Sequence, residues 1–273
     1  MEKKELAHQA IVELRDFARL YSIQSLFIVG GYCRAKVMGD DLNAIEDIDV
    51  ASAYPGDAMR ICGLFASEIL RSTPKFYQRT GTGVVNFGSG DNTIRIEFQN
   101  SSVNSYKQNE DVRLWMRKNG IENSPLQNNV YGRDFSINSL IMWLKNGEFY
   151  DLTRKAVKDI EDRKIRTLLP PSLIVKYNPM IILRAIRFAV RYDFFIVPEL
   201  RKAMKQNVGL LTKAYSKERL TKEIEKIFRT NTKDGLEELQ KYQLMSLVIP
   251  EQLKKHVRIM ERKSERNKGT NKF

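Results

Sequence analysis

This sequence of 273 residues has very little cysteine and no long hydrophobic run. Cys33 and Cys62 are its only cysteines and form no Cys-x-x-Cys pair, which excludes a disulfide scaffold and a thiolate zinc site and favours a reducing compartment. No stretch approaches the roughly 18 apolar residues that a membrane-spanning helix needs. The opening residues 1–8 carry both signs of charge and no apolar segment, unlike a secretory signal. We therefore expect a cytoplasmic protein with no membrane association.

Positive charge is what the chain has in excess. It contains 46 Lys and Arg against 33 Asp and Glu, a formal net charge of +13, and its 42% hydrophobic content is typical of a folded globular protein. This charge suits a phosphate-rich partner such as RNA or DNA, although a basic chain can also serve solubility alone.

The first half of the sequence predicts a mixed unit of helices and strands. Apolar residues at helical spacing indicate a helix near the start, and short apolar or alternating runs indicate strands. The expected elements are helices over 3–21, 33–38 and 58–70, strands over 25–29 and 47–51, and a hairpin of 84–87 with 93–98. The polar stretch 100–129 is a candidate low-complexity segment.

The second half predicts helices only, over 181–192, 198–206, 217–229 and 233–242, with Ser216 as the N-cap of the third. Pro170-Pro171 marks a change of character, and residues 251–273 carry eight Lys or Arg against three acidic residues. The predicted fold class is α+β. We expect a head with a small mixed sheet over 1–150, an all-helical region over 151–252 and a basic tail over 253–273.

The most informative segment runs from Gly30-Gly31 through Arg34 to Asp47-Ile-Asp49. Glycines let a backbone approach a ligand phosphate, and an arginine in the following helix suits the same ligand. Alternation along a strand places Asp47 and Asp49 on one face. Such aspartates also occur by chance at strand ends.

Two neighbouring carboxylates with oxygen ligands suit Mg²⁺. Glu97, on the predicted hairpin, is the best candidate for a third carboxylate. Two metal ions about 3.5–4 Å apart can activate a hydroxyl and stabilise a leaving pyrophosphate. The candidate catalytic residues are therefore Asp47, Asp49 and Glu97, with Asp47 and Asp49 as metal ligands.

Four further stretches, together with the Gly-Gly and Asp-x-Asp segment, resemble the class II tRNA nucleotidyltransferases (CCA-adding enzymes) and bacterial poly(A) polymerases of the DNA polymerase beta superfamily. They are Gly132-Arg-Asp-Phe-Ser-Ile-Asn-Ser-Leu140, Gly147-Glu-Phe-Tyr-Asp-Leu152 with Val157-Lys-Asp-Ile160, Leu183-Arg-Ala-Ile-Arg-Phe-Ala189, and Ser216-Lys-Glu-Arg219 with 243–251. The resemblance spans about residues 22–251 and implies a polymerase beta-like head followed by a helical neck.

The resemblance also implies residue roles. Asp47 and Asp49 would bind two Mg²⁺ ions, and Gly30, Gly31 and Arg34 would lie at the incoming triphosphate. Arg133 and Asp134 would meet the triphosphate and ribose. Arg184 and Arg187, three apart on one helix face, would reach one anionic ligand, although surface ion pairs would explain the same spacing.

The sequence departs from the family where the base is read. The family's Glu-Asp-x-x-Arg motif aligns with Tyr177-Asn-Pro-Met-Ile181, so Asn178 replaces the aspartate and Ile181 the arginine. Asn178 can still bind a nucleotide, but Ile181 offers no hydrogen bond, which puts ordered C-C-A addition in question. Milder departures are Ala35, Gly132 and the lack of an arginine after Glu97. The chain also ends where family members continue into helices that grip tRNA. We therefore expect either that the acceptor is not a full tRNA, or that the basic tail or a partner protein supplies the contacts to tRNA.

One segment keeps two interpretations. Residues 100–129 include Lys107, Arg113, Trp115 and Arg117, and this basic stretch could stack Trp115 on the last base of a primer. Alternatively, Leu114, Trp115 and Met116 pin a surface loop to the core.

We predict a template-independent RNA 3′-end nucleotidyltransferase that uses NTP and Mg²⁺ on an RNA acceptor, with base selection that is relaxed, altered or supplied by other residues. The resemblance implies the tRNA 3′ end as that acceptor. One alternative is a non-catalytic nucleotide- or RNA-binding descendant. Another is an enzyme with a different acceptor, a protein or a small molecule.

Overall fold

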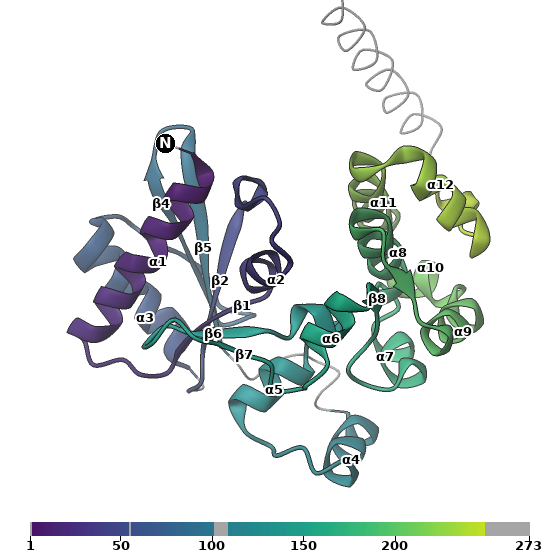
Figure 1. Ribbon diagram of the computed structural model, residues 1–273, viewed down its shortest axis with the longest axis horizontal. Helices are drawn as coiled ribbons and strands as arrows, with labels where there is room; N and C mark the ends of the chain where they lie inside the picture. Colours follow the sequence, from purple (N-terminus) through teal and green to yellow (C-terminus); the bar gives the residue numbers. More distant parts are fainter. Residues whose placement is uncertain (1, 55, 101–108, 249–273) are drawn as a thin grey trace, which may run out of the picture. The chain divides into compact units, whose positions relative to one another are not determined.

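The computed structural model describes all residues except 1, 55, 101–108 and 249–273. The chain forms two compact units, Met1–Asp162 and Arg163–Phe273 (Figure 1). The predicted basic tail, 253–273, lies outside the described residues. The expected head ended at residue 150, whereas the first unit continues to Asp162, where Ser136 Oγ donates a 2.6 Å hydrogen bond to Asp159 Oδ2.

A seven-stranded mixed sheet forms the centre of the first unit, in the order β3-β4-β5-β2-β1-β6-β7. β1 is antiparallel to both β2 and β6, while β2 and β5 are parallel. This parallel pair brings the predicted Asp-x-Asp strand beside the predicted hairpin. The strands are β1 Leu26–Val29, β2 Asp47–Ser52, β3 Lys75–Tyr77, β4 Thr82–Ser89, β5 Asn92–Asn100, β6 Ile141–Trp143 and β7 Phe149–Tyr150.

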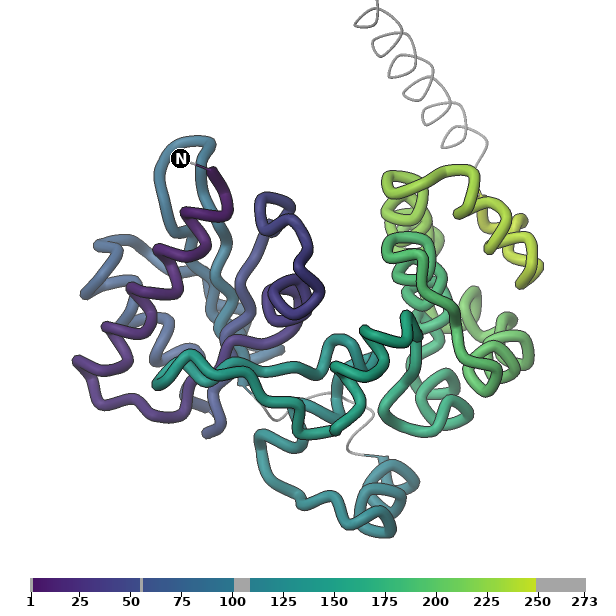
Figure 2. Tube along the Cα trace, in the orientation of Figure 1, coloured from purple at the N-terminus to yellow at the C-terminus, as the bar shows by residue number. Residues whose placement is uncertain are grey.

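Helices cover this sheet and bury its apolar side chains. α1 lies along the β4–β5 hairpin, as the path of the chain in Figure 2 shows. The rings of Phe17 in α1 and Phe65 in α3 pack edge to face at 5.2 Å, so both helices share one core. The helices of this unit are α1 Lys3–Leu20, α2 Gly31–Met38, α3 Asp57–Phe65 continued by a π-helical turn Ala66–Leu70, α4 Glu110–Lys118, α5 Pro125–Tyr131 and α6 Ala156–Glu161.

The second unit is predominantly helical. Its only sheet among the described residues is the parallel pair β8 Lys164–Ile165 and β9 Phe195–Ile196, which the expectation of an all-helical region did not include. α8 packs against α11 and α12, and α7 against α9. The helices are α7 Pro171–Tyr177, α8 Ile181–Tyr192, α9 Pro198–Asn207, α10 Leu210–Ala214, α11 Lys217–Thr230 and α12 Thr232–Lys241.

The predicted elements correspond closely to these. The expected strands at 25–29 and 47–51 are β1 and β2, the hairpin is β4–β5, and the four late helices are α8, α9, α11 and α12. Ser216 caps α11 by accepting the Arg219 backbone N–H at 3.4 Å. None of the helices in the described part of the chain has the length and apolar character to cross a membrane.

One predicted boundary needs correction, and several elements had not been predicted. α2 begins at Gly31, two residues before the expected start, because Gly30 turns the chain directly into the helix. The candidate low-complexity segment 100–129 contains two helices, α4 and α5, whose N-caps are Asn109 and Ser124. The short strands β3, β6 and β7 lacked any alternation long enough to read in the sequence.

Neighbouring glycines where β4 meets α3 offer a test of this packing. A Cβ on Gly83 would lie 2.6 Å from Cys62 Cβ, whereas one on Gly63 would lie 3.7 Å from Phe76, an ordinary contact. We expect Gly83→Ala to destabilise the protein by about 1–3 kcal/mol through overpacking. The matched Gly63→Ala should be neutral or stabilising by up to about 1 kcal/mol, because alanine favours a helix. Urea unfolding of both variants measures the difference, and equal stabilities would contradict the described packing.

Candidate functional site

The turn between β1 and α2 brings backbone unusually close to charged side chains. Gly30 has a φ of +73°, and a Cβ there would lie 2.7 Å from Asp49 Oδ2 and 3.2 Å from Arg133 Nη1. Both the left-handed φ and the lack of space require glycine. Gly30, Asp49 and Arg133 therefore meet at one place, which we call the Gly30 site.

Carboxylates line one side of the Gly30 site. Ile48 and Val50 in β2 are fully buried, so Asp47 and Asp49 share the opposite face, as the alternation predicted. Asp49 is opposite Glu97 in the parallel register of β2 and β5. The Glu97 carboxylate is engaged by Arg95 at 2.7 Å.

Asp49 lies in an environment that resists its negative charge. Burial, followed by the charges of Asp47 and Glu97, raises the pKa of Asp49 to about 6, although Arg133 acts in the opposite direction. A bound cation would relieve this cost, because it supplies positive charge where Asp47 and Glu97 add to the negative charge of Asp49.

The carboxylate oxygens at the Gly30 site can supply some, but not all, of the ligands that a divalent cation needs. Asp47 and Asp49 offer oxygen ligands, and Mg²⁺ is commonly held by one or two carboxylates together with substrate phosphates and water. Among the residues that the structure describes, no three Asp, Glu, His or Cys side chains converge as a complete metal-binding group. The protein therefore provides two carboxylates, and Glu97 stays a predicted third.

The second half of the Gly30 site comes from the segment after α5. Arg133 Nη2 donates to Asn129 Oδ1 at 3.2 Å, which helps to hold the guanidinium in place. Asn129 is buried in α5 and was not singled out from the sequence, because nothing in a polar stretch distinguishes it from its neighbours.

Arg34 and Asp134 are joined through a third residue. The buried Arg34 guanidinium donates to Asn138 Oδ1, and Asn138 Nδ2 donates to Asp134 Oδ1 at 2.8 Å. The Phe135 backbone N–H donates to the same Asp134 oxygen at 2.9 Å. The structure thus brings together Arg34 and Asp134, which the sequence analysis assigned to one nucleotide ligand. It also adds Asn138, which the sequence indicated only through its place in the 132–140 motif.

The remaining predicted residues lie in the second unit. Asn178, at the end of α7, accepts a 2.9 Å hydrogen bond on Oδ1 from the Tyr215 hydroxyl. Ile181 is fully buried at the start of α8. Arg184 and Arg187 both lie in α8, and Arg187 Nε donates at 2.5 Å to Glu223 of α11. Arg187 therefore forms a largely buried ion pair between two helices, which differs from the surface ion pair that was the alternative interpretation of its spacing.

The two interpretations of the Trp115 region can now be compared with α4. Val112 and Met116 are buried and anchor this helix, while Leu114 is exposed and Trp115 is half-buried. Met116 therefore pins the segment as proposed, and Leu114 does not.

Two protein families match the sequence. Residues 26–166 match the poly A polymerase head domain, and residues 193–255 match a region described as the probable RNA- and SrmB-binding site of polymerase A. The first match contains the whole Gly30 site.

Individual relatives agree with these matches. The mitochondrial CCA tRNA nucleotidyltransferase of Saccharomyces cerevisiae is 27% identical over 78% of this chain and 41% of its own length. The A-adding tRNA nucleotidyltransferase of Aquifex aeolicus is 28% identical over 82% of this chain and 25% of its own. An apo structure of a CCA-adding enzyme has a TM-score of 0.69 at 22% identity, over 89% of this chain and 52% of that one. The chain thus spans less than half of these two relatives and shares the fold of the solved enzyme.

The raised pKa of Asp49 predicts a pH-dependent stability difference. The unfolded chain ionises this carboxyl near pH 3.8 and the metal-free folded chain near pH 6, so the wild type loses stability as pH rises between these values. Asn cannot ionise. We expect Asp49→Asn to gain about 1–2 kcal/mol relative to the wild type between pH 5 and 7. Urea unfolding in EDTA at both pH values measures this, and a difference independent of pH would contradict the burial of the charge.

Proposed function

The chain belongs to the poly A polymerase head domain family, and from that premise we propose that it is a template-independent RNA nucleotidyltransferase with altered base selection. It adds nucleotides from NTP to the 3′-hydroxyl of an RNA, with the tRNA 3′ end as the favoured acceptor, in cytosol-like surroundings. The names of the relatives, CCA- and A-adding tRNA nucleotidyltransferases, support this class of reaction.

The observation that carries the proposal is the meeting of Gly30, Asp49 and Arg133. A glycine turn at the start of a helix directs backbone N–H groups towards a phosphate, and Arg133 adds a cation beside the carboxylates. A nucleoside triphosphate binds together with a divalent cation, so its site needs positively charged groups for the phosphates and carboxylates for the cation.

The reaction follows from these groups. The primer 3′-hydroxyl loses its proton to water as its oxygen attacks the α-phosphorus. A new O–P bond forms, and the bond to the β-phosphate oxygen breaks to release pyrophosphate. Mg²⁺ on Asp47 and Asp49 would lower the pKa of the attacking hydroxyl and neutralise charge on the leaving group. Arg133 and the first amides of α2 bind the triphosphate, while Glu97 contributes negative charge on the neighbouring strand.

We assign recognition of the ribose to the Arg34–Asn138–Asp134 chain. Asn138 and the Phe135 amide hold the Asp134 carboxylate in one orientation, from which it accepts a hydrogen bond from the ribose 2′-hydroxyl. Arg34 acts here as a positioning residue, since it holds Asn138 and adds positive charge behind the triphosphate.

Base selection is assigned to Asn178. Tyr215 donates to its Oδ1, which directs the two Nδ2 hydrogens towards a ligand. An aspartate at this position would accept from the amino groups of cytosine and adenine, whereas this amide donates and therefore matches the keto oxygens of uracil and guanine. Ile181 adds no hydrogen bond because its side chain has no donor or acceptor, and it is buried in the core.

The catalytic assignment predicts a large loss on removing either aspartate. We expect Asp47→Asn and Asp49→Asn each to lower Mg²⁺-dependent incorporation of labelled NTP into RNA by about 1000-fold or more, since each removes a ligand of the cation. The matched control is Glu46→Gln, which removes an exposed charge one residue before β2 and should retain activity. Wild-type turnover in either aspartate variant would contradict the proposed site. Wild-type protein that releases no pyrophosphate with any NTP and any RNA would favour a binding protein instead.

The base-selection assignment is tested by two variants that restore an acceptor. Asn178→Asp and Tyr215→Phe should each shift incorporation towards CTP and ATP, relative to UTP and GTP, by about 2- to 10-fold, in proportion to one hydrogen bond. An arginine at position 181 is not a useful variant, because Ile181 is fully buried and the charge would have no solvent. Competition among four labelled NTPs measures the shift, and unchanged ratios in both variants would show that Asn178 does not read the base.

A further inference from the structure

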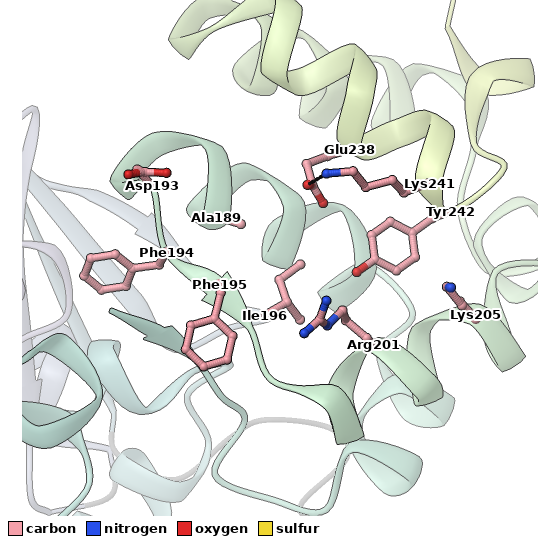
Figure 3. Close-up of a pocket in the computed structure, with 10 residues that line it drawn as sticks. All are labelled: Ala189, Asp193, Phe194, Phe195, Ile196, Arg201, Lys205, Glu238, Lys241 and Tyr242. Carbon is pink, nitrogen blue, oxygen red and sulfur yellow. Dashed lines mark hydrogen bonds and ion pairs between the residues drawn. The ribbon is translucent and has the colours of Figure 1, made fainter. Parts of the chain in front are cut away.

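A cavity in the helical unit shares no residue with the proposed nucleotidyl-transfer site. Its volume is about 390 Å³, within the range of ligand pockets. It opens between the end of α8, β9, α9 and the end of α12, as Figure 3 shows. Apart from Ala189, all of its lining residues lie in the 193–255 match.

The base of the cavity is apolar and one wall is an exposed ring. Phe194, Ile196 and Tyr242 are buried, whereas the Phe195 side chain is 45% exposed. Strand alternation in β9 turns Ile196 inward and leaves Phe195 outward. Lys164 Nζ lies 6.0 Å from the centroid of the Phe195 ring and holds it by a cation–π contact.

The charges around the cavity leave an excess of cations. The Glu238 carboxylate is paired with Lys241 at 2.6 Å, and the Asp193 carboxylate with Arg163 at 2.6 Å. Arg201 and Lys205, four residues apart in α9, make no ion pair within the described part of the chain. In Figure 3 the Arg201 guanidinium lies between the rings of Phe195 and Tyr242, and Lys205 lies farther along α9.

Tyr242 adds a neutral polar group to this arrangement. Burial, together with the charge of Glu238, raises the pKa of the Tyr242 hydroxyl to about 12. The hydroxyl therefore keeps its proton at physiological pH and can donate or accept a hydrogen bond.

We propose that this cavity binds one unpaired nucleotide of the RNA substrate, with its base stacked on Phe195 and its phosphate between Arg201 and Lys205. The choice of RNA rests on the proposed function. An exposed aromatic face beside unpaired cations is the combination that holds single strands, since any base can stack and each phosphate needs a cation. An acidic peptide would use the cations but would leave the ring without a planar partner.

The test measures binding of a fluorescein-labelled, unstructured oligoribonucleotide to the full chain by anisotropy, without Mg²⁺ or NTP. Phe195→Leu keeps an apolar side chain but removes the ring, and we expect about fivefold or greater weakening. Arg201→Gln with Lys205→Gln should weaken binding and reduce the slope of log K against log salt by about 0.7 for each phosphate that the protein no longer neutralises.

Two control variants match these changes. Lys202→Gln removes an equal charge from α9 at a residue that does not line the cavity, and Phe149→Leu replaces another exposed phenylalanine, in the first unit. Neither should alter binding by as much as the cavity variants. Equal weakening by Lys202→Gln, or unchanged affinity in Phe195→Leu, would overturn the proposal.

Competition with unlabelled AMP separates an RNA-borne nucleotide from a free one. Displacement of the oligonucleotide only by excess RNA supports the proposal, whereas displacement by AMP that Phe195→Leu abolishes would assign the cavity to a free nucleotide and overturn it. Because the measurement needs no turnover, failure of the proposed catalytic function leaves this result interpretable on its own.

Discussion

The close approach of Gly30 to the Asp49 carboxylate and the Arg133 guanidinium is the contact on which the head unit depends. The missing side chain lets β1 turn directly into α2 while β2 and the 132–140 segment come within contact distance of the turn. The Gly30 turn, Asp49 of β2 and Arg133 are thereby held together, although Gly30 and Arg133 are about 100 residues apart in the sequence. A phosphate ligand needs this convergence, because its charge must be met by backbone amides, an arginine and a carboxylate-bound cation together.

The polar network behind this point gives it a definite geometry. Arg34 is buried, yet it binds Asn138, which in turn orients Asp134. A buried guanidinium without such partners would be costly, so the helix and the 132–140 segment stabilise each other. In the second unit, Tyr215 orients the Asn178 amide in the same manner, and the Arg187–Glu223 pair joins α8 to α11. Arg133, Asp134 and Asn178 thus each have a second residue that determines the orientation of the side chain.

Periodicity was sufficient to predict most long elements, because each buries one regular apolar face. α1, α8 and α11 and the alternation Asp47-Ile48-Asp49 are examples. The strand order was not predictable, since the parallel pairing of β2 with β5 depends on contacts distant in sequence. The short strands β3 and β7 carry no periodic signal at all. Among the proposed functional residues, motif residues such as Gly30 and Asp49 were recognisable. Asn129 and Asn138 in the first unit, and Tyr215 in the second, act through partners that only the fold of each unit brings near.

The most direct measurement compares two glycine variants of the same helix. Gly30 and Gly39 flank α2 with φ of +73° and +70°, but a Cβ on Gly39 meets nothing within 4 Å. Both alanine variants carry the backbone strain, and only Gly30→Ala drives a methyl group into Asp49. For Gly30→Ala, the kcat/KM for incorporation of NTP into RNA should fall by about 100-fold or more, because the added methyl group displaces the catalytic side chains from their productive positions. For Gly39→Ala, kcat/KM should remain near the wild-type value. Equal activity in two folded variants would contradict a catalytic centre at Gly30, Asp49 and Arg133.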